Sequence, residues 1–495
     1  MNVTHRPVTL AAADLGATSG RVIAGTLTEN RFVLTELARF PNGPVGRDAS
    51  IHTDARALWG YVRDGINAGI RQFGSLAGVG VDTWGVDYGK LTATGSLVDL
   101  PVHYRDDRTQ GVPEELFSTL PARDLYQAAG LQVMPFNTIF QLMADARDGG
   151  FEETDAILLT PDLFNFWLSG QRAAEVTIAS TTGLLDVAAR QWSEPTCAHL
   201  AAHHGVPVPR ILPELVEPGT ILGESASGVL EGAVPVITVG SHDTASAVVS
   251  VPAETSRFAF ISSGTWSLVG LELDRPVLTE ASQTMDFTNE LGVDGTVRYL
   301  KNVMGLWVLS EAIRIWREAG RHLDLDRLLA EAARATPLVC VVDIDDERLF
   351  PPGDMPARLQ QLAAETGQHL EGDPVAVTRC ILDSLALAYR RTIRAACELA
   401  GRDVDVVHIV GGGCQNTLLC QLTANATGLP VVAGPAEGTA LGSLLIQARA
   451  VGALAGDLRA LRQVVSNSAE VVAYVPGAEG PEAPAWLAAE QRIRP

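Results

Sequence analysis

The sequence predicts an α/β protein made of two domains of similar size. Its 495 residues include 46% hydrophobic side chains, which is more than one core usually holds. Three strand-like runs, at 8–16, 21–27 and 32–40, open the chain and precede an alternation of helix and strand. A short turn of hydroxyl residues and glycine joins the first two runs, and a turn of the same type recurs at 262–265. These observations indicate one fold used twice.

The order of elements in the first half separates the common α/β folds. After Thr53 or Asp54, either of which can cap a helix, hydrophobic residues recur at every fourth position, and a strand at 78–86 follows. Three meandering strands before the alternation are typical of an actin-like (ribonuclease H-like) ATPase domain, whereas a dinucleotide-binding fold alternates strictly. We therefore expect two such domains that flank a catalytic cleft.

The domain boundary is expected near residue 250, where VPAETSRF is the first loop-like stretch after the helix that follows residue 243. This gives an N-terminal domain over 1–249 and a C-terminal domain over 250–495. In the second domain, Asp373 and Pro374 predict the start of a long helix, and a buried strand at 404–410 ends in a glycine triplet.

Composition restricts the class of partner and the compartment. The formal net charge of -21 disfavours nucleic acid and anionic membranes, because their phosphates would be repelled. Six cysteines without a C-x-x-C pair argue against a disulfide scaffold and a structural zinc site. Apolar runs are strand-sized, and the first ten residues lack the core of a signal peptide. We expect a cytoplasmic protein.

The stretch 234–249, VPVITVGSHDTASAVV, contains the first candidate catalytic residue. A β-branched run ends at Gly240 and Ser241, and a helix pattern begins near Thr244, so Asp243 lies at the turn between them. A carboxylate there can cap the helix, or it can face a cleft and take a proton from a substrate hydroxyl. The stretch by itself favours the cap, whereas the other motifs favour the base.

Two turns and a glycine triplet are candidate nucleotide contacts. In 14–21, glycines allow backbone amides to approach an anion, Thr18 and Ser19 add hydroxyl donors, and Asp14 would hold the Mg²⁺ that neutralises the phosphates. The turn at 262–265 is of the same type, and the triplet at 411–413 can pass a nucleoside close to the backbone. An ordinary hairpin or a tight packing turn would explain each of them singly. No P-loop or G-x-G-x-x-G run is present.

Polar and aromatic residues gather after the strand at 78–86 and in the loop beyond it. Sugar hydroxyls take directional hydrogen bonds and sugar C–H faces pack on rings, so such a group favours a polyol ligand over solvated surface charge. The group comprises Asp82, Trp84, Asp87, Tyr104, Arg105, Asp106 and Arg108.

With these residues in view, the chain resembles the FGGY carbohydrate kinases of the actin-like fold. The resemblance runs from residue 14 to about 443. It rests on the stretches DLGATSGRV, DTWGVDYG, YRDDRT, MPFNTIFQL, VGSHDTASAV, SSGTWSL, LKNVMGLW and HIVGGGCQNTLLCQLTANATGLPVVAGPAEGTALG.

The resemblance implies an ATP- and Mg²⁺-dependent kinase that phosphorylates the C1 hydroxyl of L-rhamnulose in L-rhamnose catabolism. The first domain would bind sugar and phosphate and the second the nucleotide, in a monomer or homodimer with a small-molecule ketose as its substrate. Asp243 would be the catalytic base. The implied phosphate contacts are Ala17, Thr18, Ser19, Gly20, Arg21 and Thr265, the nucleoside contact is Gly412, and the sugar contacts are Gly85, His242, Asp243, Thr244 and Asn302.

Two departures from the family pattern bear on the sugar. Tyr88 begins YGKL where the family continues with an apolar run, and Leu291 stands where a glycine is expected. Another ketose, such as L-fuculose or L-xylulose, is therefore an alternative substrate. A non-catalytic sugar-responsive binding protein is the alternative from a different class, against which the retained Asp14 and Asp243 count.

Overall fold

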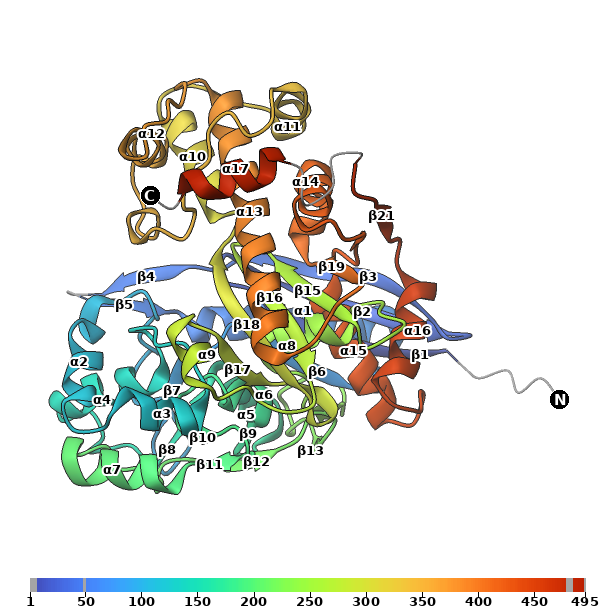
Figure 1. Ribbon diagram of the computed structural model, residues 1–495. Coiled ribbons are helices and arrows are strands. Elements are labelled where there is room, and N and C mark those ends of the chain that lie inside the picture. Colours follow the sequence, from blue (N-terminus) through green and yellow to red (C-terminus); the bar gives the residue numbers. More distant parts are fainter. Residues whose placement is uncertain (1–6, 48–49, 478–483, 494–495) are drawn as a thin grey trace. The chain divides into compact units, whose positions relative to one another are not determined.

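The structure is a computed structural model that describes residues 7–47, 50–477 and 484–493. Its contacts divide the chain into two compact units, each assembled from separate stretches of sequence (Figure 1). The first unit comprises Met1–Glu254, Glu272–Tyr299 and Gly438–Ser468, and the second comprises Thr255–Leu271, Leu300–Glu437 and Ala469–Pro495.

The first unit is built on a six-stranded sheet of order β13-β14-β6-β1-β2-β3. β1 (Val8–Leu15) and β2 (Ser19–Thr28) form an antiparallel hairpin, β3 (Arg31–Pro41) continues the meander, and β6 (Val79–Thr83) runs parallel to β1. The predicted three-strand start is confirmed. The strand predicted at 78–86 is shorter than expected, because the backbone leaves the sheet after Thr83.

Helix α1 (Ala55–Phe73) covers this sheet as the fourfold hydrophobic spacing predicts. Asp54 is the residue that caps it, since its carboxylate accepts the amide of Ala57. The buried face carries Leu58, Val62 and Ile66. At Gly65 an added Cβ would lie 2.7 Å from Val22 of β2, so the helix packs closely on the strand.

The segment between β6 and α8 adds small elements with a hydrophobic core of their own, which includes Leu116, Phe140, Ile178 and Leu200. Within this segment β10 (Leu185–Asp186) pairs with β11 (Gln191–Trp192), β7 (Tyr88–Leu91) pairs with β8 (Ala156–Leu159), and β9 (Ala173–Glu175) pairs with β12 (Glu214–Val216), while β4 (Pro44–Arg47) and β5 (Ser50–Thr53) form a further pair before α1. The other elements are α2 (Val112–Phe117), α3 (Ala122–Ala129), α4 (Thr138–Arg147), α5 (Thr160–Ser169), α6 (Val176–Ala179), α7 (Glu194–His204), β13 (Ile221–Glu224), β14 (Pro235–Ile237) and α8 (Asp243–Val249).

The second unit repeats the local arrangement of the first. β15 (Phe258–Ser263) and β16 (Trp266–Leu273) form an antiparallel hairpin, and β15 runs parallel to β19 (Val406–Val410), just as β1 pairs with β2 and with β6. These strands belong to a sheet of order β17-β18-β16-β15-β19-β20-β21. Its other members are β20 (Val431–Ala433) and β21 (Val472–Tyr474), together with β17 (Thr288–Leu291), which lies in a stretch assigned to the first unit, and β18 (Val297–Met304), within which the division between the units falls.

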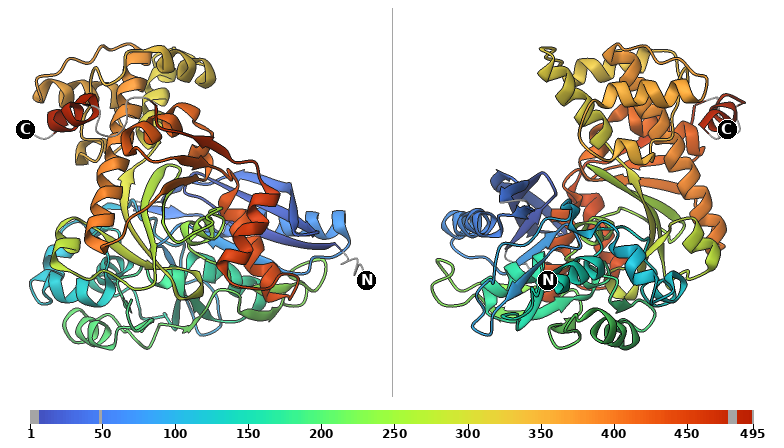
Figure 2. Two further views of the ribbon diagram at one scale, coloured as in Figure 1. Left: turned by 45° about the vertical axis from the view of Figure 1, so that its right-hand side comes forward. Right: turned by 90° about the vertical axis from the view of Figure 1, so that its left-hand side faces the viewer.

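Helix α13 (Pro374–Ala400) is the predicted long helix of this unit and is visible in orange in Figure 2. Asp373 caps it by accepting the amides of Val375 and Ala376. Tyr389 on its buried face hydrogen-bonds Ser267 of β16 at 2.7 Å, which fixes the helix on the sheet. The remaining helices of the chain are α9 (Glu280–Thr284), α10 (Trp307–Glu318), α11 (Leu325–Arg334), α12 (Met355–Glu365), α14 (Thr417–Thr427), α15 (Gly438–Ala450), α16 (Leu458–Ser468) and α17 (Pro484–Ile493).

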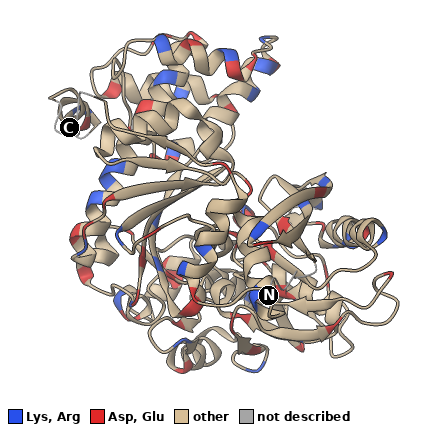
Figure 3. Ribbon diagram, turned by 90° about the vertical axis from the view of Figure 1, so that its right-hand side faces the viewer, with Lys and Arg blue, Asp and Glu red and all other residues tan. Residues whose placement is uncertain are grey.

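Acidic and basic residues are interspersed along the helices (Figure 3), and many form ion pairs. Arg314, for example, pairs with both Glu311 and Glu318 on α10. Among the residues that the structure describes, no helix is long and apolar enough to cross a membrane.

The close approach of α15 to α8 gives a prediction about stability. A Cβ on Gly442 would lie 1.8 Å from the carbonyl oxygen of Ser246, which is backbone and cannot rotate away. We expect Gly442→Ala to lower the free energy of unfolding by about 1–3 kcal/mol or more. Gly60 in α1 has open space around it, so Gly60→Ala should raise the same quantity by about 0.4–1 kcal/mol. Urea unfolding of both variants checks this, and equal effects would contradict it.

Candidate active site

Three carboxylates meet where strands of the first unit end. Asp14 on β1 lies opposite Asp82 on β6 in the parallel register. The next residue of β6, Thr83, forms a bridge with His242, and its amide donates to the carbonyl of Ser241 at 2.9 Å. The start of α8, with Asp243, is thereby brought beside the carboxyl ends of β1 and β6, where α/β sheets bind their ligands.

The environment of Asp82 shows how strongly negative charge is concentrated here. Its side chain is fully buried, and within the described residues neither carboxylate oxygen has a hydrogen-bond partner of normal geometry. Burial and the charges of Asp14 and Asp243 raise its pKa well above the usual value, and Arg21 and the Ser443 hydroxyl oppose the shift only in part. Such a group is typical of a site that accepts a cation.

Asp14 and Arg21, predicted to hold a metal ion and phosphate, pair with each other. Two guanidinium nitrogens of Arg21 donate to one oxygen of Asp14, at 3.0 and 2.8 Å. Asp14 is nearly buried, and Arg21 is 22% exposed. Within the described residues, no group of three or more His, Cys, Asp or Glu side chains is arranged to hold a metal ion. A cation here would therefore need further ligands from water or phosphate.

The hairpin between β1 and β2 has a different shape from the one expected. β2 already begins at Ser19, so Gly16 to Thr18 form the turn, and the amide of Gly16 donates to the carbonyl of Ser19. Thr18 and Ser19 are exposed. Gly20 faces inward, where a Cβ would lie 2.2 Å from the Phe40 ring, so packing explains this glycine.

Asp243 is the first residue of α8, and His242 occupies the N-cap position. One oxygen of Asp243, Oδ1, accepts the amide and the hydroxyl of Thr244, at 2.6 and 3.1 Å. An N-cap would instead accept amides two or three residues ahead, so Asp243 does not cap the helix. Partial burial raises its pKa, the nearby Asp14 adds to this, and His242 opposes it. The result is a stronger base than an ordinary aspartate.

The turn before Asp243 is held by the short helix α6. Glu175, fully buried, accepts the amide of Ser241 at 3.1 Å and also the first amides of α6. Thr177 accepts the amide of His242 at 3.3 Å. Sequence reasoning did not identify Glu175, although it lies in the polar run EVTIASTTGLLD.

The loop that follows β6 is strained and tightly held. Val86 has a φ of 69°, which is rare for a β-branched residue. Its carbonyl accepts the hydroxyl of Thr138 and its amide donates to Thr181. Gly85 lies on the same loop. A Cβ added to it would lie 3.2 Å from the Thr181 side chain, which is a tight contact. Strained loops of this kind are common at ligand sites.

Several residues of the expected sugar-binding group are occupied by internal contacts. Asp87 is buried and accepts the indole N–H of Trp84 at 3.0 Å, and burial raises its pKa to about 7. Asp106 accepts the hydroxyl of Ser50, and Arg108 pairs with Asp145. These residues are therefore not simply solvated surface charge, and they build the wall around the loop.

The ion pair of Glu290 and Arg298 also escaped prediction. Both side chains are buried, and the guanidinium lies 2.9 Å from the carboxylate. The pair contacts His242, which is 3.0 Å from Glu290 and 3.2 Å from Arg298. Glu290 stands in the stretch that departs from the family pattern, and this irregularity was the one signal in the sequence.

In the second unit, the predicted nucleotide contacts lie at two turns. Thr265 is in the β15–β16 turn, where its carbonyl accepts the amide of Trp307. In the glycine triplet, a Cβ on Gly413 would lie 2.0 Å from the Ser263 hydroxyl, whereas Gly412 has open space around it. Gly412 is thus the member of the triplet that packing does not explain. Asn302 lies on β18 and is half-buried.

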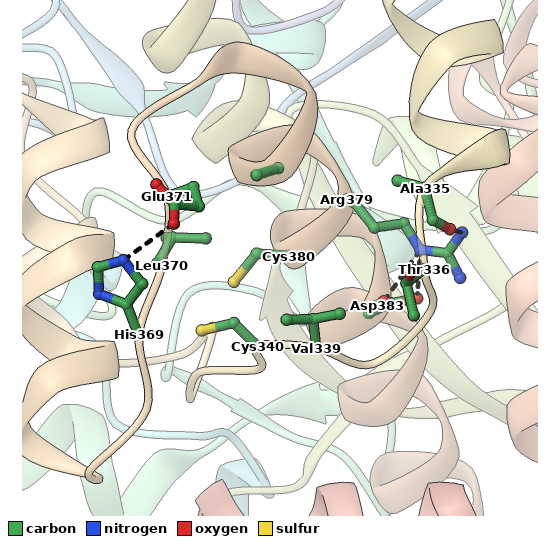
Figure 4. Close-up of a pocket in the computed structure, with 11 residues that line it drawn as sticks. Ala335, Thr336, Val339, Cys340, His369, Leu370, Glu371, Arg379, Cys380 and Asp383 are labelled. Atoms are coloured by element: carbon green, nitrogen blue, oxygen red, sulfur yellow. Dashed lines mark hydrogen bonds and ion pairs between the residues drawn. The ribbon is translucent and has the colours of Figure 1, made fainter.

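A separate pocket of about 190 Å³ in the second unit contains none of the predicted site residues (Figure 4). Its lining includes Cys340, Cys380 and Leu370. The buried charges on its wall, Arg379 and Asp383, satisfy each other at 3.0 Å. The pocket therefore offers a ligand few unpaired polar groups.

Family models match both halves of the chain. The FGGY family of carbohydrate kinases matches with its N-terminal domain at residues 9–250 and with its C-terminal domain at residues 259–451. These matches confirm the family that the motifs suggested.

Relatives named as rhamnulokinases match over nearly the full length. A rhamnulokinase of Bacteroides thetaiotaomicron is 39% identical over 94% of this chain and 95% of its own. A rhamnulokinase of Klebsiella pneumoniae is 38% identical over 96% of this chain and 95% of its own.

Solved structures confirm the two-domain α/β fold. A gluconate kinase from Lactobacillus acidophilus has a TM-score of 0.79 at 14% identity and covers 99% of this chain and 97% of its own. A Plasmodium falciparum glycerol kinase with ADP has a TM-score of 0.76 at 13% identity and covers 99% of both chains.

The buried Glu175 predicts how stability depends on pH. Burial raises its pKa from 4.5 to about 7, so its favourable contribution is complete below about 4.5 and is lost as the pH rises through about 7. The loss is at most about 3 kcal/mol. Glu175→Gln should be less stable than wild type at pH 5, because its amide cannot accept every donor, but should lose less stability between pH 5 and 8. Thermal unfolding at both pH values checks this, with exposed Glu194→Gln as the control that keeps the wild-type slope.

Proposed function

Because the chain belongs to the FGGY family of carbohydrate kinases, we propose that it transfers the γ-phosphoryl group of ATP to the C1 hydroxyl of L-rhamnulose. The observation that carries the choice of sugar is the 38–39% identity to rhamnulokinases over at least 94% of the chain. The reaction would serve L-rhamnose catabolism. The coarser conclusion, a carbohydrate kinase that acts on a small sugar, follows from the family itself.

Asp243 is the base in this proposal. Its Oδ1 is held by Thr244, so Oδ2 is the oxygen available to a sugar hydroxyl. A raised pKa favours proton transfer from the hydroxyl as its oxygen approaches phosphorus. His242 and Thr244 are its neighbours in the chain and would orient the sugar, together with Gly85 and Asn302.

A Mg²⁺ ion fits the carboxylates at the ends of β1 and β6. Mg²⁺ is commonly held by one or two carboxylates with water and substrate phosphates, and Asp82 has two buried oxygens without partners of normal geometry among the described residues. Asp14, with Asp82 beside it, would hold the ion. When bound, Mg²⁺ neutralises charge on the phosphates.

The nucleotide contacts follow from the two hairpins and the glycine triplet. Thr18 and Ser19 are exposed at one turn and offer hydroxyl donors, and Arg21 offers a guanidinium, to an anion. Ala17 and Gly20 would contribute backbone groups. Thr265 and Gly412 of the second unit would contact phosphate and nucleoside.

The two departures from the family pattern concern side chains that the structure buries. Leu291 is fully buried in a hydrophobic core, and its amide donates to Ser180. Tyr88 is buried as well and donates its hydroxyl to Asp145. Both side chains therefore pack the interior.

A panel of ketoses tests the proposal. ADP release should be fastest with L-rhamnulose and slower with L-fuculose and L-xylulose, and phosphorus NMR should show a C1 phosphomonoester. Release without sugar is the background. A higher kcat/KM for another ketose would show that this ketose, and not L-rhamnulose, is the substrate. If no ketose gives ADP release above the background, the non-catalytic alternative is favoured.

Removing the base gives the second test. Asp243→Asn keeps the shape of the side chain but cannot take a proton, so kcat should fall about 10²–10⁴-fold while the sugar still binds. ADP-release assays measure kcat, and isothermal titration calorimetry measures binding of the sugar. A kcat near that of wild type would limit Asp243 to a structural role.

Asp14 should affect the metal ion more than the sugar. In Asp14→Asn, the charge that would hold Mg²⁺ is removed, so the Mg²⁺ concentration for half-maximal rate should rise about 10-fold or more while the sugar KM changes little. Magnesium titrations at saturating ATP and sugar check this. A raised sugar KM with an unchanged metal requirement would contradict it.

A further inference from the structure

The ion pair of Arg298 and Glu290, which contacts His242, is unusual because both charges are buried in the protein interior, where desolvation makes a charge costly. Arg298 on β18 is completely buried, and two of its nitrogens donate to the carbonyl of Leu291, at 3.2 and 3.1 Å. Its third nitrogen lies 2.9 Å from Glu290 on β17. A buried ion pair often contributes less to stability than apolar residues of the same size. A role besides stability is therefore to be sought at the group that the pair contacts.

That group is the imidazole of His242. Its Nδ1 faces the pair, 3.2 Å from Arg298 and 3.0 Å from Glu290, and its Nε2 lies 3.5 Å from Oδ1 of Asp243. The side chain is 9% exposed, so these neighbours decide its orientation. One nitrogen is thus held by the ion pair while the other faces the proposed base.

The position of the ring proton follows from these contacts. A guanidinium can only donate hydrogen bonds, and a carboxylate can only accept them. If Nε2 carries a proton, it faces the carboxylate of Asp243 favourably; without one, two lone pairs would face each other. Arg298 lies within hydrogen-bond distance of Nδ1, at 3.2 Å, and a guanidinium needs a lone pair there. Oε2 of Glu290 is 3.0 Å from Nδ1 but, within the described residues, has no hydrogen-bond partner of normal geometry, so it balances the charge of Arg298 and does not require a proton on Nδ1.

The consequence for Asp243 concerns which of its oxygens is free. Within the described residues, Oδ1 accepts both donors of Thr244 and is also the oxygen near Nε2 of His242. Anchoring Oδ1 on all these groups leaves Oδ2 for a substrate hydroxyl. A ring turned away would leave Oδ1 with the donors of Thr244 alone, and the carboxylate would be held less firmly in the orientation that presents Oδ2.

We propose that Glu290 and Arg298 are positioning residues, which hold His242 with a proton on Nε2 and thereby keep Oδ2 of Asp243 directed at the substrate hydroxyl. The inference rests on the proposed role of Asp243 as the base. Glu290 and Arg298 would then affect the chemical step through His242 and Asp243, without contacting the sugar themselves.

Substitution of Glu290 tests this assignment. Glu290→Gln removes the charge with little change in shape, so kcat should fall about 10–100-fold, as for other supporting groups behind a reacting residue, with a sugar KM within about threefold of wild type. Asp383→Asn is the matched control, because it also leaves a buried arginine, Arg379, with a neutral partner. It should lower the melting temperature similarly and change kcat by less than about twofold.

A double-mutant cycle separates this inference from the proposed function. In the Asp243→Asn background, adding Glu290→Gln should lower kcat by no more than about twofold, since the group on which it acts is gone. An equal loss in both backgrounds, or the same kcat loss in Asp383→Asn, would overturn the positioning role while leaving Asp243 as the base. If Asp243→Asn alone keeps full kcat, it is the proposed base that fails.

A measurement on the intact protein does not depend on the variants folding well. Nitrogen NMR of histidine-labelled wild type, with His242→Asn used only to assign the signal, should show a proton on Nε2 of His242. A bare Nε2 would overturn the inference.

Discussion

The crowding of three carboxylates at the ends of β1 and β6 and at the start of α8 is the constraint on which the site depends. The parallel register places Asp14 opposite Asp82, and the bridge from Thr83 brings in the turn before Asp243. Burial, and after it the repulsion between the carboxylates, makes this arrangement costly, and together they raise the pKa of Asp82 well above its usual value. In the proposed kinase, a Mg²⁺ ion held beside Asp14 and Asp82 would offset this cost.

The groups that surround this cluster are themselves polar and buried. Glu175 supports the turn through the amide of Ser241, and the pair of Glu290 and Arg298 supports the ring of His242. Apolar packing could stabilise the same backbone at lower cost, but it could not set the orientation of a hydrogen-bonding side chain. These buried polar contacts therefore cost folding stability, but they fix the orientation of the side chains around Asp243.

The sequence predicts the parts of this structure that are local. The face of α1, the caps at Asp54 and Asp373 and the paired hairpins follow from spacing within a few residues, and the structure confirms them. The end of β6 was wrong, because Thr138 and Thr181 hold Val86 in a conformation that its own propensity disfavours. The partners of His242 were missed for a similar reason: they stand about fifty residues away in the chain, and nothing in a single sequence couples them.

The most direct test of the account is a crystal structure of the protein with L-rhamnulose, Mg²⁺ and a non-hydrolysable ATP analogue. We expect the C1 hydroxyl within about 2.6–3.2 Å of Oδ2 of Asp243, with Oδ1 still held by Thr244 and His242. A sugar whose C1 hydroxyl contacts Asp14 or Asp82 instead, with Asp243 turned away from it, would contradict the account.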